Sequence, residues 1–388
     1  MKLRTTLTLI TMAGSLAGCS NMLHNMNPVN WFGSSNTAEK PAALKPFTAS
    51  VHLNEVWHHE MSCKHVSNFT PAVVDQAVFA TCDKGTLARF DLKSGNKIWE
   101  TDTRLPISAG VGASATAEYV GTSKGELLAF DPQGKATWHV QLSSEVIGIP
   151  EEDNHIVVVR TGNGDIYGLN ADTGKQLWRY QHNLPDLMLR DQSGVALRSG
   201  GVFAGYPGGK LVALSIESGV VGWEADVSVP HGATDMERVN DVVGTPVMGD
   251  GTVCSVTYQG RVACFNIQNG NQVWARDVSS TTGIAIDDNN VYVTDSDGNV
   301  HAWDKDHGAE RWVTKDFERR NLTAPVVVSD QVIVGDYQGY LQALSTGDGH
   351  QTGRAATDGA AIAAQPVPLD GVVVTQTAKG DVYVFTVK

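Results

Sequence analysis

Charged residues are scarce in this sequence, and most of them are acidic. Asp, Glu, Lys and Arg make up 18% of the 388 residues, and the formal charge at pH 7 is -13. The low charged content disfavours long solvated helices. The acidic balance disfavours a nonspecific nucleic-acid binder, which needs a basic surface to neutralise phosphates, so we expect no nucleic-acid partner. The 40 glycines indicate many tight turns instead.

The apolar run at the N-terminus is too short to cross a membrane. Only fourteen residues separate Arg4 from Cys19, whereas a membrane-spanning helix needs about 20. A positive start followed by a short apolar run is typical of a secretory signal peptide, which we predict at residues 1–18.

The stretch "LAGC", ending at Cys19, resembles the lipobox of bacterial lipoproteins. The resemblance implies cleavage before Cys19 and attachment of acyl chains such as palmitate to that cysteine. Ser20 follows instead of Asp, which implies sorting to the outer membrane with the protein facing the periplasm. An ordinary secreted protein with a coincidental Cys19 is the alternative.

Residues 19–50 are predicted to form the lipidated cysteine and a flexible tether. From Asn21 to Ser50 the sequence is rich in Asn, Ser, Pro and Lys and has no hydrophobic period. A flexible coil of this length spans roughly 30 Å root-mean-square, so the folded part, residues 51–388, can stand off the membrane.

Cysteine is rare, and its spacing limits the chemistry that the protein can perform. With Cys19 lipidated, Cys254 and Cys264 lie symmetrically about Gln259, so a hairpin there brings them close together. Cys63 and Cys82 form the other candidate pair. Both disulfides suit an oxidising periplasm, and reduced buried thiols are the alternative.

An internal repeat covers almost all of the chain after Ser50. The block "GTLARFD" recurs with variations in eight copies, whose first glycines are 38 to 51 residues apart: Gly85, Gly125, Gly164, Gly209, Gly260, Gly298, Gly339 and Gly380. A period near 40 with short alternating strands is typical of the four-stranded blades of a β-propeller. We therefore predict an all-β, eight-bladed propeller.

A tryptophan marks the outer strand in seven of the eight predicted blades. The positions are Trp57, Trp99, Trp138, Trp178, Trp223, Trp274 and Trp312, and Gly353 stands in the eighth. Because a single blade exposes two apolar faces, the indoles are expected to clamp each blade to the next. Trp57 precedes every complete repeat, so the strand at 51–59 is expected to complete the eighth blade and close the ring.

The repeated pattern "D-x-x-[ST]-G-x-x-x-W" resembles that of the quinoprotein-like propellers, which include dehydrogenases that use pyrroloquinoline quinone (PQQ). Those enzymes usually hold the quinone with an adjacent cysteine pair and a calcium site, and no Cys-Cys dipeptide exists here. We therefore expect no enzymatic activity and no cofactor. A PQQ-dependent dehydrogenase-like protein and a propeller that binds a small ligand in its central channel are the alternatives.

Other motifs that suggest chemistry have simpler explanations. The stretch 121–125, "GTSKG", matches a nucleophile elbow, but it lies between two predicted strands. The stretch 295–299, "DSDGN", begins like a calcium loop and lacks the closing Glu. His58, His59, Cys63 and His65 have no standard zinc spacing. We expect hairpin turns in the first two places and no metal site.

Two connections are longer than the others. The 45- and 51-residue intervals contain the insertions 183–194 and 229–244. Long connections on a rigid ring are where binding residues concentrate. In the first insertion Leu187, Leu189 and Arg190 form a small apolar and basic patch, although the leucines could equally cover the end of the propeller.

The lipobox, the tether, the eight repeats and the "LxLR" loop together resemble the BamB family, propeller lipoproteins of the outer-membrane β-barrel assembly (BAM) machinery. The resemblance implies a scaffold without enzymatic activity that binds the POTRA domains of BamA. It also implies contact with other BAM subunits and unfolded outer-membrane proteins. The family's contact residues match Leu187, Leu189, Arg190 and Asp241, while Val243 replaces a second family aspartate.

Overall fold

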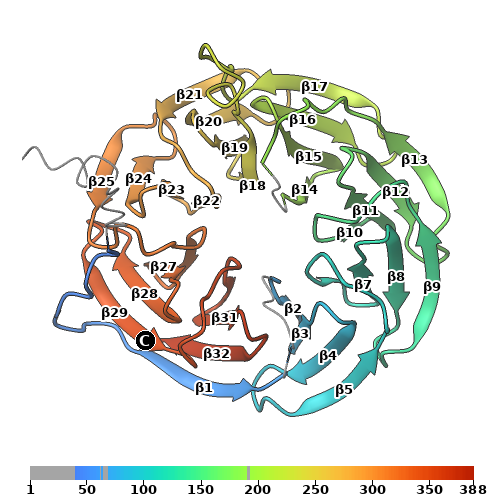
Figure 1. Ribbon diagram of the computed structural model, residues 1–388, viewed down its shortest axis with the longest axis horizontal. Coiled ribbons are helices and arrows are strands. Elements are labelled where there is room, and N and C mark those ends of the chain that lie inside the picture. The colour runs from blue at the N-terminus through green and yellow to red at the C-terminus, as the bar shows by residue number, and fades with distance from the viewer. Residues whose placement is uncertain (1–39, 62, 64–68, 190–192) are drawn as a thin grey trace, which may run out of the picture. The chain divides into compact units, whose positions relative to one another are not determined.

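Eight four-stranded antiparallel sheets are arranged as the blades of a ring in the computed structural model (Figure 1). The structure describes residues 40–61, 63, 69–189 and 193–388. The predicted eight-bladed β-propeller is therefore confirmed. In these described residues no helix is long and apolar enough to cross a membrane.

Each blade begins near the ring axis and ends at the rim. Blades 1 to 4 contain, in this order, β2 (Ala72–Val74), β3 (Ala77–Thr81), β4 (Thr86–Asp91), β5 (Lys97–Asp102); β6 (Gly112–Ala113), β7 (Glu118–Gly121), β8 (Glu126–Phe130), β9 (Ala136–Gln141); β10 (Glu151–Asp153), β11 (Ile156–Arg160), β12 (Ile166–Asn170), β13 (Gln176–Tyr180); and β14 (Val195–Arg198), β15 (Gly201–Tyr206), β16 (Lys210–Ser215), β17 (Val221–Asp226). Blades 5 to 8 contain β18 (Val242–Met248), β19 (Thr252–Thr257), β20 (Arg261–Asn266), β21 (Gln272–Asp277); β22 (Ile284–Ile286), β23 (Asn290–Thr294), β24 (Val300–Asp304), β25 (Glu310–Thr314); β26 (Val326–Val328), β27 (Gln331–Gly335), β28 (Tyr340–Ser345), β29 (Gln351–Ala356); and β30 (Val367–Leu369), β31 (Val372–Gln376), β32 (Val382–Val387), β1 (Leu53–His59).

The position of a strand within its blade decides its burial. All five residues of β3 are buried, because the second strand of a blade packs against a neighbouring blade on each side. In β5, at the rim, exposed residues alternate with half-buried ones, as expected for a strand with one face in water. The apolar runs of the sequence therefore became middle strands, and the alternating segments became outer strands.

The ring closes through the N-terminal strand, as predicted. Strand β1 pairs antiparallel with β32, so that Leu53 lies opposite Val387 and His59 opposite Val382. Figure 1 shows β1 lying outside β32 near the C-terminus. The first strand of the folded chain therefore completes the last blade, and the ends of the ring are held by backbone hydrogen bonds.

Indoles clamp the blades together, which is also confirmed. In blade 3 Trp178 donates its indole N–H to the carbonyl of Ile216 in blade 4, at 2.7 Å. A Cβ atom built on Gly219 would lie 2.6 Å from the Trp178 ring. Because Gly219 has a φ of +68° and carries no side chain, the indole can lie flat against this turn.

The same contact holds seven of the eight junctions. The pairs of indole and underlying glycine are Trp57–Gly95, Trp99–Gly134, Trp138–Gly174, Trp178–Gly219, Trp223–Gly270, Trp274–Gly308 and Trp312–Gly349. In each pair the indole N–H donates to a backbone carbonyl of the same turn. Each glycine thus receives the tryptophan of the preceding blade.

The eighth junction, between blades 7 and 8, uses a different contact. At Gly353 a Cβ atom would lie 2.7 Å from the carbonyl oxygen of Val51 and 2.8 Å from the side chain of Leu53. The amides of Ser50 and Val51 both donate to the carbonyl of Thr352. The backbone that leads into β1 therefore occupies the space of the missing tryptophan.

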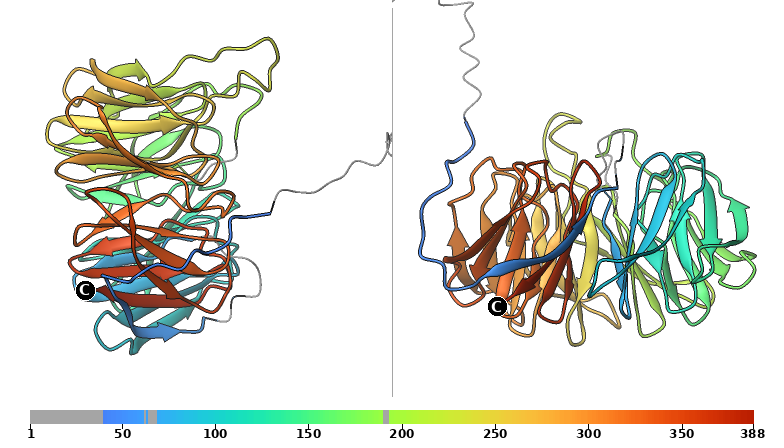
Figure 2. Two further views of the ribbon diagram at one scale, coloured as in Figure 1. Left: turned by 90° about the vertical axis from the view of Figure 1, so that its left-hand side faces the viewer. Right: turned by 90° about the horizontal axis from the view of Figure 1, so that it is seen from below.

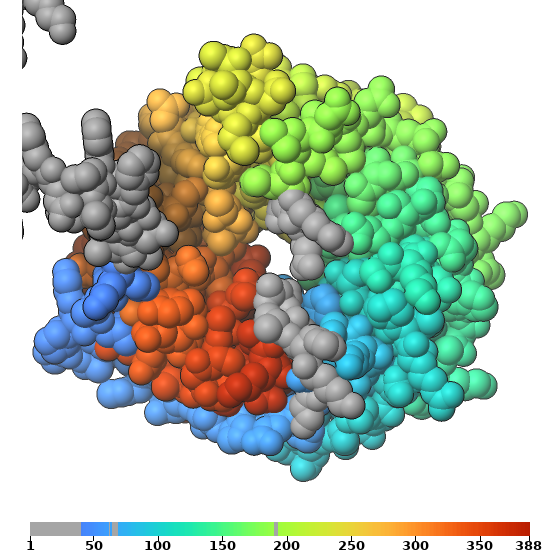
Figure 3. Space-filling view, in the orientation of Figure 1, coloured from blue at the N-terminus to red at the C-terminus, as the bar shows by residue number. Residues whose placement is uncertain are grey.

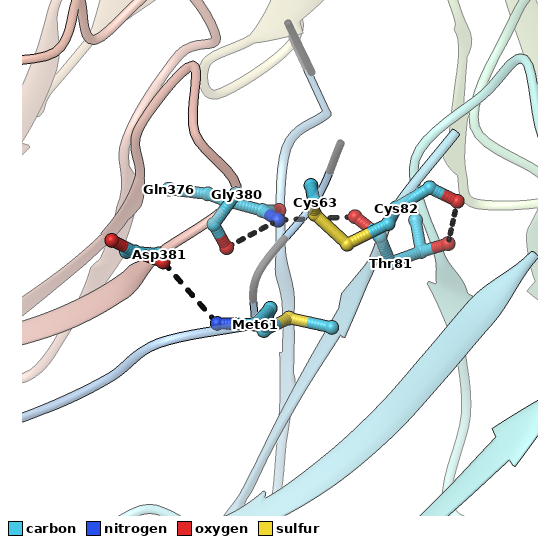
Figure 4. Close-up of a disulfide and its surroundings, with 7 residues drawn as sticks. All are labelled: Met61, Cys63, Thr81, Cys82, Gln376, Gly380 and Asp381. Atoms are coloured by element: carbon cyan, nitrogen blue, oxygen red, sulfur yellow. Dashed lines mark hydrogen bonds between the residues drawn. A yellow bond between two sulfur atoms is a disulfide. The ribbon is translucent and has the colours of Figure 1, made fainter. Parts of the chain in front are cut away.

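One disulfide lies where blades 8 and 1 meet (Figure 4). Cys63, after β1, is joined to Cys82, after β3. The Cys63 sulfur packs directly on Gly380 of blade 8, and the side chain of Gln376 donates to the carbonyl of Thr81 in blade 1 at 3.0 Å. The bond therefore attaches the end of the closing strand to the first blade.

The second disulfide lies inside blade 5. Cys254 in β19 and Cys264 in β20 are direct neighbours in the strand register, and both are completely buried. Their Cα atoms are 4.1 Å apart, which fits the close type of antiparallel pair.

Shortening one clamp should destabilise the whole ring. Trp178→Ala removes a large buried side chain and is expected to lower the free energy of unfolding by about 3 to 5 kcal/mol. Trp178→Phe keeps most of the packing and loses the hydrogen bond to Ile216, so its cost should be smaller, about 1 to 3 kcal/mol. Urea denaturation followed by tryptophan fluorescence measures both, and equal stability of the two variants would contradict the clamp.

Removal of the closing strand should open the ring. A chain without residues 51–59 loses the pairing with β32 and the cover of the blade 7 edge, so we expect a melting temperature lower by on the order of 10 °C. A deletion of the same length in the tether, residues 22–30, is the control and should melt like the parent. Calorimetry measures both, and an unchanged transition after loss of 51–59 would show that closure does not depend on β1.

Candidate docking site on the loop face

The two faces of the ring carry different kinds of connection. One face, called the loop face below, carries the hairpins between second and third strands and the connections between blades. The opposite face carries the turns between first and second and between third and fourth strands. Both insertions lie on the loop face, and the one between β17 and β18 projects from it (Figure 2).

The first insertion joins blades 3 and 4, and the second joins blades 4 and 5. The first runs from the end of β13 to β14, and the second fills residues 227–241. The second ends earlier than the predicted 229–244, because β18 begins at Val242, and Val242 and Val243 already pair with β19. The insertions are therefore neighbours across blade 4.

Asp241 ties the two insertions together. Its carboxylate accepts hydrogen bonds from the backbone N–H of Leu189, at 2.5 Å, and from that of Gly208, at 3.2 Å. The residue is only 3% exposed. A buried carboxylate needs such donors, because an unsatisfied charge in the interior is costly. The last residue of the second insertion thus positions the first insertion and the hairpin of blade 4.

The two predicted leucines have different environments. Leu187 is 45% exposed and Met188 beside it is 38% exposed. Leu189 is partly buried and packs against the apolar cluster of blades 5 and 6 that includes Val243 and Trp274. Leu189 therefore holds the loop to the ring, while Leu187 and Met188 present apolar surface to solvent.

A cavity of about 240 Å³ opens beside this loop. Its walls come from the blade 2–3 connection, the hairpins of blades 3 and 4, both insertions and the start of β18: Glu145, Ile147, Arg160, Thr161, Gly162, Gly164, Leu184, Met188, Leu189, Ser193, Pro207, Asp241 and Val242. The walls are mainly apolar, with charged groups at Glu145, Arg160 and Asp241. Such a hollow next to exposed apolar side chains can receive a side chain of a partner.

Arg160, one of the residues that line the cavity, packs against the aromatic ring of Tyr206. The guanidinium of Arg160 is 5% exposed, lies 4.6 Å from the Tyr206 ring centre and donates to the carbonyl of Gly205 at 2.6 Å. The centre of the His182 ring lies 4.1 Å from the centre of the Tyr206 ring. His182 follows β13, at the start of the first insertion. Burial lowers the pKa of His182, so its imidazole is held neutral near pH 7.

The second insertion has its own internal order. The Glu237 carboxylate accepts the backbone N–H groups of Ala233 and Thr234, at 2.8 and 3.0 Å. These hydrogen bonds, first of all the one from Thr234, lower the pKa of Glu237. Val229 and Met236 are 62% and 68% exposed. This insertion is therefore a tied loop that carries exposed apolar side chains beside the first one.

Val243 lies within the core and not on the docking surface. It belongs to β18, is 1% exposed and packs in the same cluster as Cys254 and Trp274. Valine suits this environment, since an aspartate there would bury a charge among apolar groups. Of the two positions at which the family resemblance implied aspartates, Asp241 carries the carboxylate that ties the loops.

Several predicted positions lie outside the described residues, namely Cys19, His65 and Arg190. Of the other predicted histidines, His58 stacks on Tyr383 and bonds to Glu55, and His59 lies against Phe90. Residues 121–125 and 295–299 form hairpins, as predicted. No cluster of three or more potential metal ligands occurs in the described part of the chain.

The ring axis has a second hollow, of about 350 Å³, which opens at the centre of the loop face (Figure 3). Its lining consists of small residues, mainly Gly, Ala and Thr, together with Ile147, Ile149 and Gln365. The described residues of this lining offer hydroxyl and amide groups.

Three lining residues were not predicted as site residues, namely Arg160, Leu184 and Met188. Arg160 could have been noticed, because it ends a second strand, "IVVVR", whose equivalents end in Thr, Gly, Tyr or Gln. No repeat pattern marks Leu184 and Met188, since they lie in an insertion that occurs once. Their role depends on how that loop is placed.

The chain is a β-propeller of the quinoprotein-like repeat type whose two longest connections between blades lie on the same face. The sequence model of a family described as outer membrane protein assembly factor BamB matches residues 83–314. BamB of Nitrosomonas eutropha is 38% identical over 96% of this chain and 92% of its own. BamB of Bordetella pertussis is 35% identical over 94% and 92%. The chain belongs to the BamB family of outer membrane protein assembly factors.

Solved structures agree with this assignment. The crystal structure of BamB from Moraxella catarrhalis superposes with a TM-score of 0.80 at 26% identity and covers 86% of this chain and all of its own. Quinohemoprotein alcohol dehydrogenase from Comamonas testosteroni superposes with a TM-score of 0.69 at 15% identity, over 86% of this chain and 76% of its own. The likeness to the dehydrogenase shows a shared fold alone.

Loss of the Asp241 carboxylate should release the first insertion. Asp241→Ala leaves the Leu189 and Gly208 amides without this acceptor, at a cost to ring stability of about 1 to 3 kcal/mol. We expect faster hydrogen exchange at the Leu189 amide, measured by mass spectrometry of peptides spanning the loop. Asp235→Ala, on an exposed part of the second insertion, is the control. Equal exchange in the two variants would contradict the tie.

Proposed function

We propose that this protein is a non-enzymatic scaffold lipoprotein of the outer-membrane β-barrel assembly machinery. It docks on the periplasmic POTRA domains of BamA and assists folding and insertion of β-barrel outer-membrane proteins. The observation that carries the proposal is the Asp241 tie, which holds an exposed apolar loop in one conformation beside a cavity. Membership of the BamB family supports the choice of partner.

The docking chemistry follows from the placement of the loop. Leu187 and Met188 offer apolar surface, and the tie through Leu189 restricts the backbone before binding. Preorganisation lowers the entropy cost of association, so a small patch can bind with useful affinity. Arg190 adds a guanidinium that can form a bidentate pair with a carboxylate of the partner.

The anchor completes the proposed role. Acyl chains on Cys19 hold the protein at the periplasmic face of the outer membrane, and several chains together give stable attachment. The tether lets the ring reach BamA, other BAM subunits and unfolded outer-membrane proteins. A rigid propeller with ordered loops suits a scaffold, because preorganised surfaces commonly bind with little backbone movement.

Changes in the loop should abolish binding without unfolding the ring. Leu187→Ala, Leu189→Ala and Arg190→Ala together remove the apolar and cationic contacts, so co-purification with BamA should fall at least about tenfold, as expected for loss of interface hot spots. Val220→Ala with Val221→Ala is the control, since it removes exposed apolar surface from the opposite face. The melting temperature verifies folding.

Leu189 also packs on the ring, so a second variant separates docking from loop order. Leu187→Ser with Met188→Ser changes only the two exposed side chains and leaves the hydrogen bond from Leu189 to Asp241 in place. It should weaken the pull-down as well. Undiminished binding of BamA by both variants would refute the site.

A further inference from the structure

Residues 41–52, called the strap, lie along the outside of blade 7 before β1 begins (Figure 2). At its start the backbone N–H of Ala42 donates to the carbonyl of Glu318 at 3.0 Å. At its end the amides of Ser50 and Val51 donate to the carbonyl of Thr352. The strap is thus bound at both ends to the same blade region.

The two ends of the strap lie at different faces of the ring. Glu318 belongs to the connection between β25 and β26, which is on the loop face. Thr352 is the second residue of β29, a strand that begins at the opposite face. The strap therefore crosses the thickness of the ring antiparallel to β29, starting at the loop face.

This crossing reverses where the chain leaves the ring. Strand β1 starts at the opposite face, where Leu53 pairs with Val387 and the backbones of His52 and Lys388 exchange two hydrogen bonds. A tether attached directly to β1 would therefore leave from the opposite face. With the strap in place, it leaves from the face that carries both insertions.

A buried ion pair holds the first part of the strap. The Arg320 side chain is 2% exposed and donates two hydrogen bonds to Asp336, whose side chain is fully buried. The third nitrogen of the same guanidinium, Nη1, donates to the carbonyl of Ala42 at 3.0 Å. A buried guanidinium needs acceptors for all its N–H groups, and the strap supplies one of them.

A second arginine holds the middle of the strap. The guanidinium of Arg354 lies 5.0 Å from the centre of the Phe47 ring and donates to the carbonyl of Lys45 at 3.3 Å. The ion pair between Lys45 and Asp316 is largely exposed, so it contributes little. Arg320 lies in the connection before β26, and Arg354 lies in β29. Together they bind the strap near its start and in its middle.

We propose that the strap fixes the departure point of the membrane anchor on the loop face and thereby turns the docking site toward the lipid surface. The inference rests on the proposed lipidation of Cys19. From Cys19 to Lys40 the chain has 22 residues, which as a flexible coil span roughly 25 Å. The ring face at which this coil begins is on average the face nearer to the bilayer, where a membrane-embedded partner is met.

Energy transfer to labelled lipid tests the orientation on the full lipidated protein. A donor dye is placed by Lys124→Cys on the loop face or by Gln133→Cys on the opposite face, both exposed positions of blade 2. Vesicles of phosphatidylethanolamine and phosphatidylglycerol carry the acceptor. We expect more transfer from position 124 than from position 133.

A strap variant provides the second arm. Ala42→Pro removes the N–H donated to Glu318, Lys45→Glu opposes Asp316, and Phe47→Ser removes the ring from Arg354. All three changes lie outside the blades, so folding should persist. Released from blade 7, the tether leaves near β1, and the difference in transfer between the two positions should vanish or reverse.

The outcomes separate this inference from the proposed function. Vesicle-bound protein with equal transfer from both positions, or with more from position 133, overturns the orientation and leaves the anchor intact. An unchanged difference in the strap variant overturns the role of the strap. A protein that does not associate with vesicles at all overturns the proposed anchor, and the orientation falls with it.

Discussion

The contact between an indole and a turn glycine of the next blade is the interaction on which the ring depends. A four-stranded blade has two apolar faces and cannot remain folded alone, so each must be covered by a neighbour. The indole does this at the rim, from the fourth strand of the blade. It lies flat because the turn residue has no Cβ, and its N–H finds a backbone carbonyl of the same turn, as Trp178 does with Ile216. In the recurring Gly-x-x-x-Trp, the glycine therefore packs against the indole of the preceding blade, and the tryptophan packs on the turn glycine of the following blade.

The indole–glycine contacts are alike in seven junctions. The features that distinguish one blade from another therefore lie in the connections between blades. Two of these, on either side of blade 4, are longer than the others, and the buried carboxylate of Asp241 joins them. The tie gives a loop with exposed Leu187 and Met188 a definite position next to a hollow. The dehydrogenase with the same fold shows that a propeller does not imply a function. In the proposed function the rigid ring acts as a support, and the loop face makes the contacts with the partner.

The eighth junction differs from the others because blade 8 combines β30, β31 and β32 with β1. The third and fourth strands of blade 8, β32 and β1, are not consecutive in the chain, so this blade lacks the connecting turn whose glycine receives an indole in the other blades. The backbone before β1 packs on Gly353 instead. The same segment continues as the strap along blade 7. The strap, residues 41–52, thus completes the packing between blades 7 and 8, leads into β1 and determines the face from which the tether leaves. The disulfide of Cys63 with Cys82 secures the other end of that strand.

The repeat was enough to predict the eight blades, their strand order and the closure through Trp57, because blades with two apolar faces must stack on one another. It also indicated Cys254 and Cys264 as neighbours, since a hairpin about Gln259 makes them so. The folded ring was needed to find that Asp241 holds the first insertion, that Arg160 lines its cavity, that Val243 is buried and that Arg320 binds the strap. These contacts join residues far apart in the chain at positions that occur once. A periodic pattern carries no information about them, because their geometry arises only when the finished ring brings the segments together.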